Sequence, residues 1–249
     1  MFMYTLNIES SKGNLAVSWS NLDSLAKCAS IQAGRYLKND TSNIDLHHKN
    51  FREWNQMFWK QRENMGVFDL PKSAKIVDIG AGTSIVDLLL YSYVPDSKFY
   101  LIDGNSWDIS FKDNVTPSVF FSKNYPIYNS WEVVSDAITT SKFDQTRFVL
   151  LNPESEFPKD VDAVTSYFSY CFHYPKEVYW DKILVSLKKD GKLVLDVRLL
   201  KSKDVIGEIS EEMKCNPVKF VLPELPKYTD NYEIVESGVI GYRCMWTRN

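Results

Sequence analysis

The chain has 249 residues, of which 44% are hydrophobic and 24% are charged, so its composition excludes collagen, disordered tails and disulfide-built miniature domains. A formal net charge of -3 without any run of Lys or Arg means that nucleic acid is not an expected partner. No apolar stretch reaches the ~20 residues that span a bilayer, and no export signal or disulfide spacing is present. These features predict a cytoplasmic protein that does not associate with membranes.

The first 72 residues predict an N-terminal helical extension. Residues 21–37 have a helical pattern behind an Asn cap, and a second helix carries an apolar stripe at spacings of three, four and seven, formed by Phe51, Trp54, Phe58 and Met65. Two interpretations of the extension are open, a lid over a ligand or an element buried against the rest of the chain.

From residue 73 onward, short β-branched runs alternate with helical segments. Seven strands are predicted, at residues 75–79, 98–103, 147–151, 161–166, 192–197, 232–236 and 242–247. Helices are expected around Trp131, Val134 and Ile138, and between Pro175 and Gly191. Residues 104–146 form a long insert, which either contributes to a ligand site or packs as an edge of the sheet.

The alternation predicts an α/β domain over residues 73–249 with a Rossmann-like, doubly wound and mostly parallel sheet of seven strands. Only residues 237–241 separate the last two strands, whereas a parallel crossover needs about a dozen residues. The last two strands are therefore predicted to form a C-terminal antiparallel hairpin.

A glycine turn follows the first of these strands, where residues 78–83 read Asp-Ile-Gly-Ala-Gly-Thr. Gly80 and Gly82 permit a positive φ and let a ligand approach the backbone at the start of a helix. Asp103 ends the second strand, where its carboxylate can accept both ribose hydroxyl protons of an adenosine. Turn and acid together predict a nucleoside site; the alternative is a tight turn with an Asp helix cap.

Two ligand classes share this pattern, dinucleotides and S-adenosylmethionine. A dinucleotide turn usually has a third glycine, but Ile85 occupies that position. S-adenosylmethionine has no phosphate, and its α-ammonium suits Asp78, either directly or through water; otherwise Asp78 is a solvated turn residue. The pattern favours S-adenosylmethionine as the cofactor.

The chain resembles the class I S-adenosylmethionine-dependent methyltransferases over residues 73–249. The matching motifs are residues 75–83, 101–105, 148–153, 161–168 and 188–195, and Ser84 stands where a third glycine is common. The resemblance also implies the terminal hairpin, which distinguishes this family's sheet from the dinucleotide-binding sheet. It implies that the cofactor is held by residues at the ends of the first four strands, namely Asp78, Gly80, Ala81, Gly82, Asp103, Gly104, Asn105, Asn152, Pro153 and Tyr167. Asn152 departs from the Asp that the family usually has there.

Methyl transfer from a sulfonium mainly requires that donor and acceptor be aligned and water excluded. Tyr167 and His173, in an aromatic segment after the fourth strand, are the candidate catalytic residues. His173 is either a general base or a helix cap, and the rings either line the pocket or belong to the core. No metal is expected.

The leading hypothesis is methyl transfer to a small-molecule acceptor, the hydroxyl oxygen of a sugar-like compound or another metabolite. The alternative is a nonenzymatic module that binds S-adenosylmethionine to regulate a partner. A dehydrogenase is the third interpretation, and the sequence leaves the oligomeric state open.

Overall fold

The computed structural model describes residues 3–21, 24, 44–64, 66–103, 131–167, 179–198, 232–237 and 241–248. The chain forms two structural units. The hairpin unit comprises Met1–Ala74, Gly82–Phe99 and Tyr128–Val149. The sheet unit comprises Lys75–Ala81, Tyr100–Ile127 and Leu150–Asn249.

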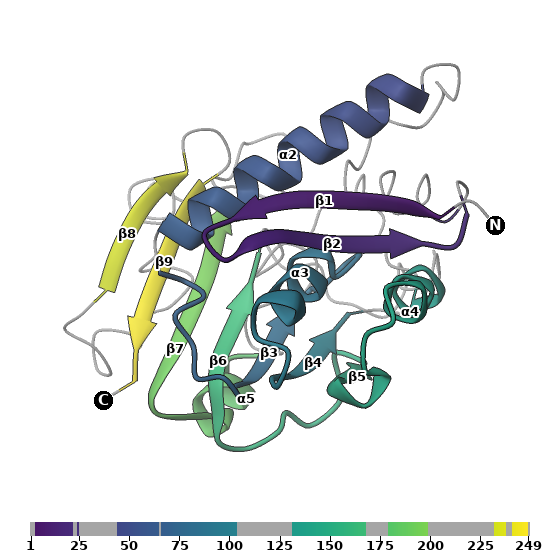
Figure 1. Ribbon diagram of the computed structural model, residues 1–249. Coiled ribbons are helices and arrows are strands. Elements are labelled where there is room, and N and C mark those ends of the chain that lie inside the picture. Colours follow the sequence, from purple (N-terminus) through teal and green to yellow (C-terminus); the bar gives the residue numbers. More distant parts are fainter. Residues whose placement is uncertain are drawn as a thin grey trace, which may run out of the picture. The chain divides into compact units, whose positions relative to one another are not determined.

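The hairpin unit begins with two antiparallel strands, β1 (Tyr4–Ser10) and β2 (Gly13–Trp19), joined by a two-residue turn (Figure 1). Apolar residues alternate with polar ones along both strands, so one face is buried, formed by Leu6, Ile8, Leu15, Val17 and Trp19. The prediction that the N-terminal extension is helical is wrong over β1 and β2, because buried apolar residues recur there at every second position, which is the period of a strand and not of a helix.

Among the described residues, the hairpin unit also contains the helices α2 (Ile44–Asn64), α3 (Ile85–Tyr93) and α4 (Trp131–Thr140). The predicted stripe on α2 is confirmed at Phe51 and Phe58, which are buried. The Trp19 and Phe51 rings meet edge to face at 6.3 Å. Met65 and nearly all of the predicted helix at 21–37 lie outside the described residues.

Side chains occupy the outer edges of both hairpin strands. On the β1 edge, the Glu9 N–H donates to Gln56 Oε1 at 2.7 Å, and Gln56 Nε2 donates to the Glu9 carbonyl at 2.9 Å. On the β2 edge, the Ser18 N–H donates to Ser141 Oγ at 2.8 Å and the Ser20 N–H to Asp136 Oδ2 at 3.1 Å. These bonds satisfy strand edges that would otherwise be open to pairing with another chain.

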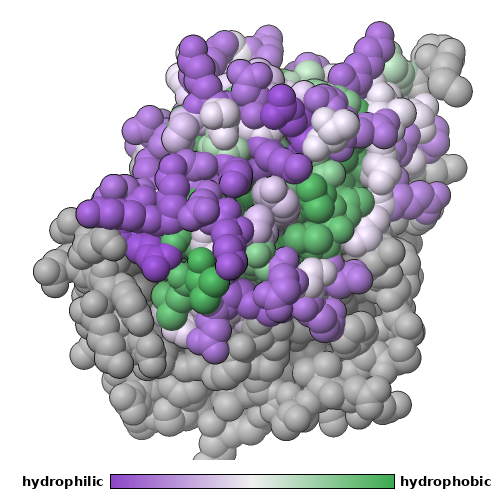
Figure 2. Space-filling model, turned by 90° about the horizontal axis from the view of Figure 1, so that it is seen from below, coloured by the Kyte–Doolittle hydropathy of each residue, from purple (hydrophilic) through white to green (hydrophobic). Residues whose placement is uncertain are grey.

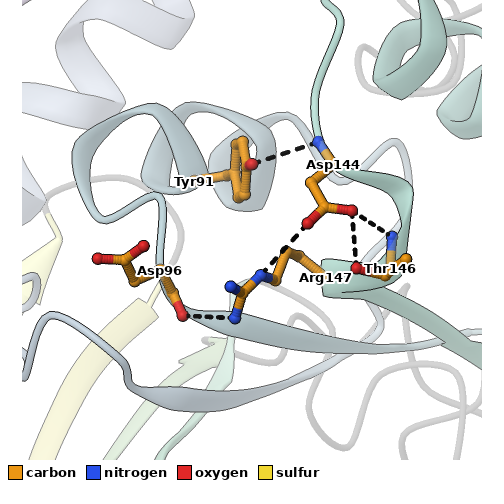
Figure 3. A network of polar contacts seen from close by, with 5 residues as sticks. All are labelled: Tyr91, Asp96, Asp144, Thr146 and Arg147. Atoms are coloured by element: carbon orange, nitrogen blue, oxygen red, sulfur yellow. Dashed lines mark hydrogen bonds and ion pairs between the residues drawn. The ribbon is translucent and has the colours of Figure 1, made fainter.

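A polar network fixes the entry to β5 (Phe148–Leu151) within the hairpin unit (Figure 3). Asp144 accepts hydrogen bonds from the N–H and hydroxyl of Thr146 at 3.0 and 2.7 Å, and its own N–H donates to the Tyr91 hydroxyl at 3.2 Å. Arg147 pairs with Asp144 and donates to the Asp96 carbonyl at 3.0 Å. The Thr146 hydroxyl is the main cause that lowers the pKa of Asp144 below its usual value.

The sheet unit holds β3, β6 to β9 and the carboxyl ends of β4 and β5. The sheet has the strand order β5-β4-β3-β6-β7-β9-β8 (Figure 1). The bounds of the strands not yet given are β3 Lys75–Ile79, β4 Lys98–Ile102, β6 Val161–Ser166, β7 Leu187–Arg198, β8 Tyr232–Ser237 and β9 Gly241–Thr247.

The centre of the sheet is parallel, since β3 pairs parallel with β6 and β6 with β7. This confirms the predicted α/β class. β9 runs antiparallel to both β7 and β8. Because β4 and β5 extend the sheet on one side of β3 while β6 and β7 extend it on the other, the order reverses between β3 and β6. In open α/β sheets, ligands bind at such a reversal, outside the carboxyl ends of the strands.

Helix α5 of the sheet unit is shorter than the helix predicted between Pro175 and Gly191. Helix α5 spans Trp180–Ser186 and does not continue to Gly191, because β7 begins directly at Leu187. Arg248 Nη1 donates to the Leu184 carbonyl at 2.8 Å and also to the Leu187 carbonyl, so the end of the helix is satisfied by this guanidinium. Gly191 lies within the strand, where an added Cβ would come within 2.8 Å of the Lys188 carbonyl oxygen.

The described surface is mainly polar. Figure 2 shows one face on which hydrophilic residues surround small, separate apolar groups. Large hydrophobic side chains that are exposed among the described residues are Met3, Met57 and Val185. Of the helices in the described ranges, none has the length and apolar character needed to cross a bilayer.

Candidate nucleoside-binding site

Backbone hydrogen bonds in the sheet unit tie together the ends of three neighbouring strands. Gly80 and Ala81, which follow β3, both donate their N–H groups to the Ile102 carbonyl at the end of β4, at 2.7 and 3.1 Å. The Asp103 N–H donates to the Leu151 carbonyl at the end of β5, at 3.1 Å. The glycine turn, Asp103 and the chain after β5 therefore meet at one edge of the sheet, as the sequence predicts.

The two glycines have the backbone conformation that the turn was predicted to need. Gly80 has φ 70° and Gly82 has φ 54°, in the left-handed region that costs other residues about 1–2 kcal/mol. The N–H groups of Gly80 and Ala81 are used within the sheet. The two glycines are therefore predicted to contribute open space for a ligand beside the turn. That role stays a prediction.

Ser84 is a strained residue whose importance the sequence did not reveal. It also has a positive φ, 53°, and precedes α3 without a side-chain cap, while its carbonyl accepts the Leu88 N–H at 2.9 Å. Its side chain is 2% exposed, and within the described ranges its hydroxyl has no hydrogen-bond partner. A glycine would remove both the strain and the buried hydroxyl. The position is the one where the resembled family commonly has a third glycine.

Asp78 and Thr165 form a buried polar pair at the reversal point of the sheet. They are register partners on β3 and β6 and are 3% and 4% exposed. The Thr165 hydroxyl lies 2.6 Å from Asp78 Oδ1, and the next residue, Ser166, donates its hydroxyl to the Ile79 carbonyl at 2.7 Å. Neither hydroxyl was singled out as a site residue from the sequence, although both belong to the strand predicted at residues 161–166.

The other predicted binding residues follow β4, β5 and β6. Asp103 is 7% exposed, and burying a carboxylate is costly unless a partner compensates it. Asn152 is exposed and Pro153 is buried. Lys182 Nζ on α5 donates to the carbonyls of Pro153 and of Ser155 at 2.9 and 3.0 Å, which anchors the loop that bears Asn152.

Of the remaining predicted site residues, one is described by the structure. Tyr167 directly follows β6 and is half-buried. Gly104, Asn105 and His173 lie outside the described residues. Within the described ranges, no group of three or more His, Cys, Asp or Glu side chains is arranged to hold a metal ion.

No protein-family model and no curated protein sequence matches the chain. Solved structures similar to it include an rRNA methylase from Streptococcus thermophilus, with 12% identity, 75% of this chain and 95% of that chain covered, and a TM-score of 0.48. A SAM-dependent methyltransferase from Aquifex aeolicus has 14% identity, 75% and 87% coverage and a TM-score of 0.45. TYW2 from M. jannaschii in complex with AdoMet has 18% identity, 76% and 74% coverage and a TM-score of 0.46. At these identities and TM-scores the likeness carries no argument about function.

Proposed function

We propose that the chain is a class I S-adenosylmethionine-dependent methyltransferase that methylates a hydroxyl oxygen of a sugar-like compound or another small metabolite. The observation that supports this most is the pair of buried carboxylates, Asp78 and Asp103, at the carboxyl ends of β3 and β4 beside the Gly80 turn. A reversal point in a doubly wound sheet is where such a ligand is expected.

The residues fit the cofactor in chemical type. The Asp103 carboxylate can accept from two ribose hydroxyls, and charge-assisted bonds of this kind are among the strongest in proteins. Asp78 offers a negative charge to the α-ammonium, and the exposed amide of Asn152 offers both a donor and an acceptor to the adenine edge. No phosphate-binding third glycine is present, which suits a ligand without a pyrophosphate.

When bound, S-adenosylmethionine supplies a methyl group on a sulfonium, which is a good leaving group. The chain has to bind the methyl donor and the acceptor, align them and exclude water. Tyr167, next to β6, is proposed to shape the wall where the acceptor lies. His173 is proposed to take the proton from the acceptor hydroxyl, with helix capping as its alternative role.

The proposal is tested by thermal shift with S-adenosylmethionine, S-adenosylhomocysteine and NAD, followed by an assay of S-adenosylhomocysteine release with hydroxylated metabolites and sugars. We expect stabilisation by the first two ligands only, and release that depends on an acceptor. Stabilisation by NAD alone would contradict the proposal. Tight binding of S-adenosylhomocysteine without turnover on any acceptor would favour the nonenzymatic module, and methylation of added RNA would overturn the small-molecule acceptor.

A further inference from the structure

The Asp78–Thr165 pair lies where the sheet does not need a polar contact. Both side chains are almost fully buried, and the backbones of β3 and β6 are already paired through Ile76, Val77 and Asp78. Burying a carboxylate beside a hydroxyl is costlier than burying apolar groups of the same size. The pair lies at the carboxyl ends of β3 and β6, where the ligand is proposed to bind. Its position therefore points to a role in recognising that ligand.

The hydroxyl has one hydrogen to donate and two acceptors within reach. Thr165 Oγ1 lies 2.6 Å from Asp78 Oδ1 and 3.3 Å from the Val77 carbonyl. The shorter distance and the negative charge favour the carboxylate. This bond restricts rotation of the Asp78 side chain and uses one of the carboxylate's about four acceptor positions.

We propose that Thr165 is a positioning residue that holds the Asp78 carboxylate in the orientation required by the α-ammonium of the cofactor. This inference rests on the proposed function, because Asp78 has that role only if S-adenosylmethionine is the ligand. Thr165 touches neither cofactor nor acceptor in this account and acts only through Asp78. Fixing the carboxylate before the ligand arrives reduces the entropy lost on binding.

Ser166 provides a matched control. Its hydroxyl is also buried, at 0% exposure, and makes a hydrogen bond of similar length, 2.7 Å, but to the backbone carbonyl of Ile79. Removing the Ser166 hydroxyl therefore costs one buried hydrogen bond between the same two strands without affecting the Asp78 carboxylate. A difference in ligand affinity between the Thr165 and Ser166 variants would therefore come from the Asp78 carboxylate.

The experiment compares two ligands by calorimetry, S-adenosylhomocysteine and 5′-methylthioadenosine, which lacks the ammonium. We expect Thr165→Val to lower the affinity for S-adenosylhomocysteine about fivefold, as one lost hydrogen bond would, and to leave that for 5′-methylthioadenosine within about twofold. Thr165→Ser keeps the hydroxyl and should restore the affinity. Ser166→Ala should change the affinities for the two ligands by the same factor.

Equal losses for both ligands in Thr165→Val, or no loss for either, would overturn the inference and leave the proposed function intact. If the Val variant does not fold, Thr165→Ala and Thr165→Ser give the same comparison. An equal ratio of the affinities for the two ligands in these two variants would overturn the inference. A wild-type protein that binds neither ligand would instead overturn the proposed function, and the inference with it.

Discussion

The two structural units use polar side chains in different ways. In the hairpin unit, Gln56, Asp136 and Ser141 are only partly buried and bond to backbone groups along the edges of β1 and β2. In the sheet unit, Asp78 and Asp103 are buried at the ends of strands whose backbone groups already have partners. Polar groups at strand edges complete the fold of the hairpin unit, whereas burying an acid at a strand end costs free energy that its partners must offset. The comparison makes the strand ends of the sheet unit the place to test for ligand binding.

The largest effect on stability is expected in the buried core of the hairpin unit. Trp19 is 0% exposed and lies against the Phe51 ring, so Trp19→Ala should lower the free energy of unfolding by about 3–5 kcal/mol. Denaturant unfolding measures this loss. Val185→Ala, at a side chain that is 68% exposed, is the control and should change stability by less than about 0.5 kcal/mol. A loss below about 1 kcal/mol for Trp19→Ala would contradict the buried packing of the hairpin.

A second prediction concerns strain beside the glycine turn. Ser84→Gly should raise the free energy of unfolding by about 1 kcal/mol, because it removes a positive φ of 53° and a buried hydroxyl. The matched control is Lys142→Gly, where φ is 59° but no hydroxyl is buried. The gain at Ser84 should exceed the gain at Lys142. Destabilisation by Ser84→Gly would show that the hydroxyl is needed for folding.

A third prediction concerns the β2 edge, where the effect on stability should be similar in size to that at Ser84 and should depend on pH. Burial alone would raise the pKa of Asp136, but hydrogen bonds from Ser20, Ser24 and Thr140 outweigh it and hold the pKa below its usual value. A lowered pKa stabilises the folded state above the unfolded pKa of about 4 and ceases to do so as pH falls through the folded pKa. Asp136→Asn should therefore cost about 1 kcal/mol at pH 7 and progressively less toward pH 3. Stability curves of wild type and variant that stay parallel over this range would contradict the assignment.

The sequence was sufficient where the signal is local. The strands at 75–79 and 161–166 were predicted with the bounds that the structure has, because both are short apolar runs. The hairpin at the N-terminus was not predicted, although Leu6, Ile8, Leu15 and Val17 alternate with more polar residues as in a half-buried strand. Each strand has only seven residues, so the alternating signal is short.

The same distinction holds for the candidate site. The positions of Gly80, Gly82 and Asp103 after their strands could be predicted, because the glycine turn and the acid each directly follow a strand in the sequence. This prediction does not require knowing which strands pair. The contact between Asp78 and Thr165 joins residues 87 positions apart, and its existence depends on the register of two strands. One sequence gives no information about that register. The roles of all these residues in binding or catalysis remain predictions, and Gly104, Asn105 and His173 lie outside the described residues.

Binding of a nucleoside at the strand ends of the sheet unit is tested by the affinity of Asp103→Ala for S-adenosylhomocysteine, determined by calorimetry beside the wild type. Removing the carboxylate should eliminate two charge-assisted hydrogen bonds to the ribose, and the affinity should fall at least about tenfold. Circular dichroism should show that the variant is folded. An unchanged affinity in a folded Asp103→Ala protein would contradict the claim that the strand ends of the sheet unit bind the nucleoside.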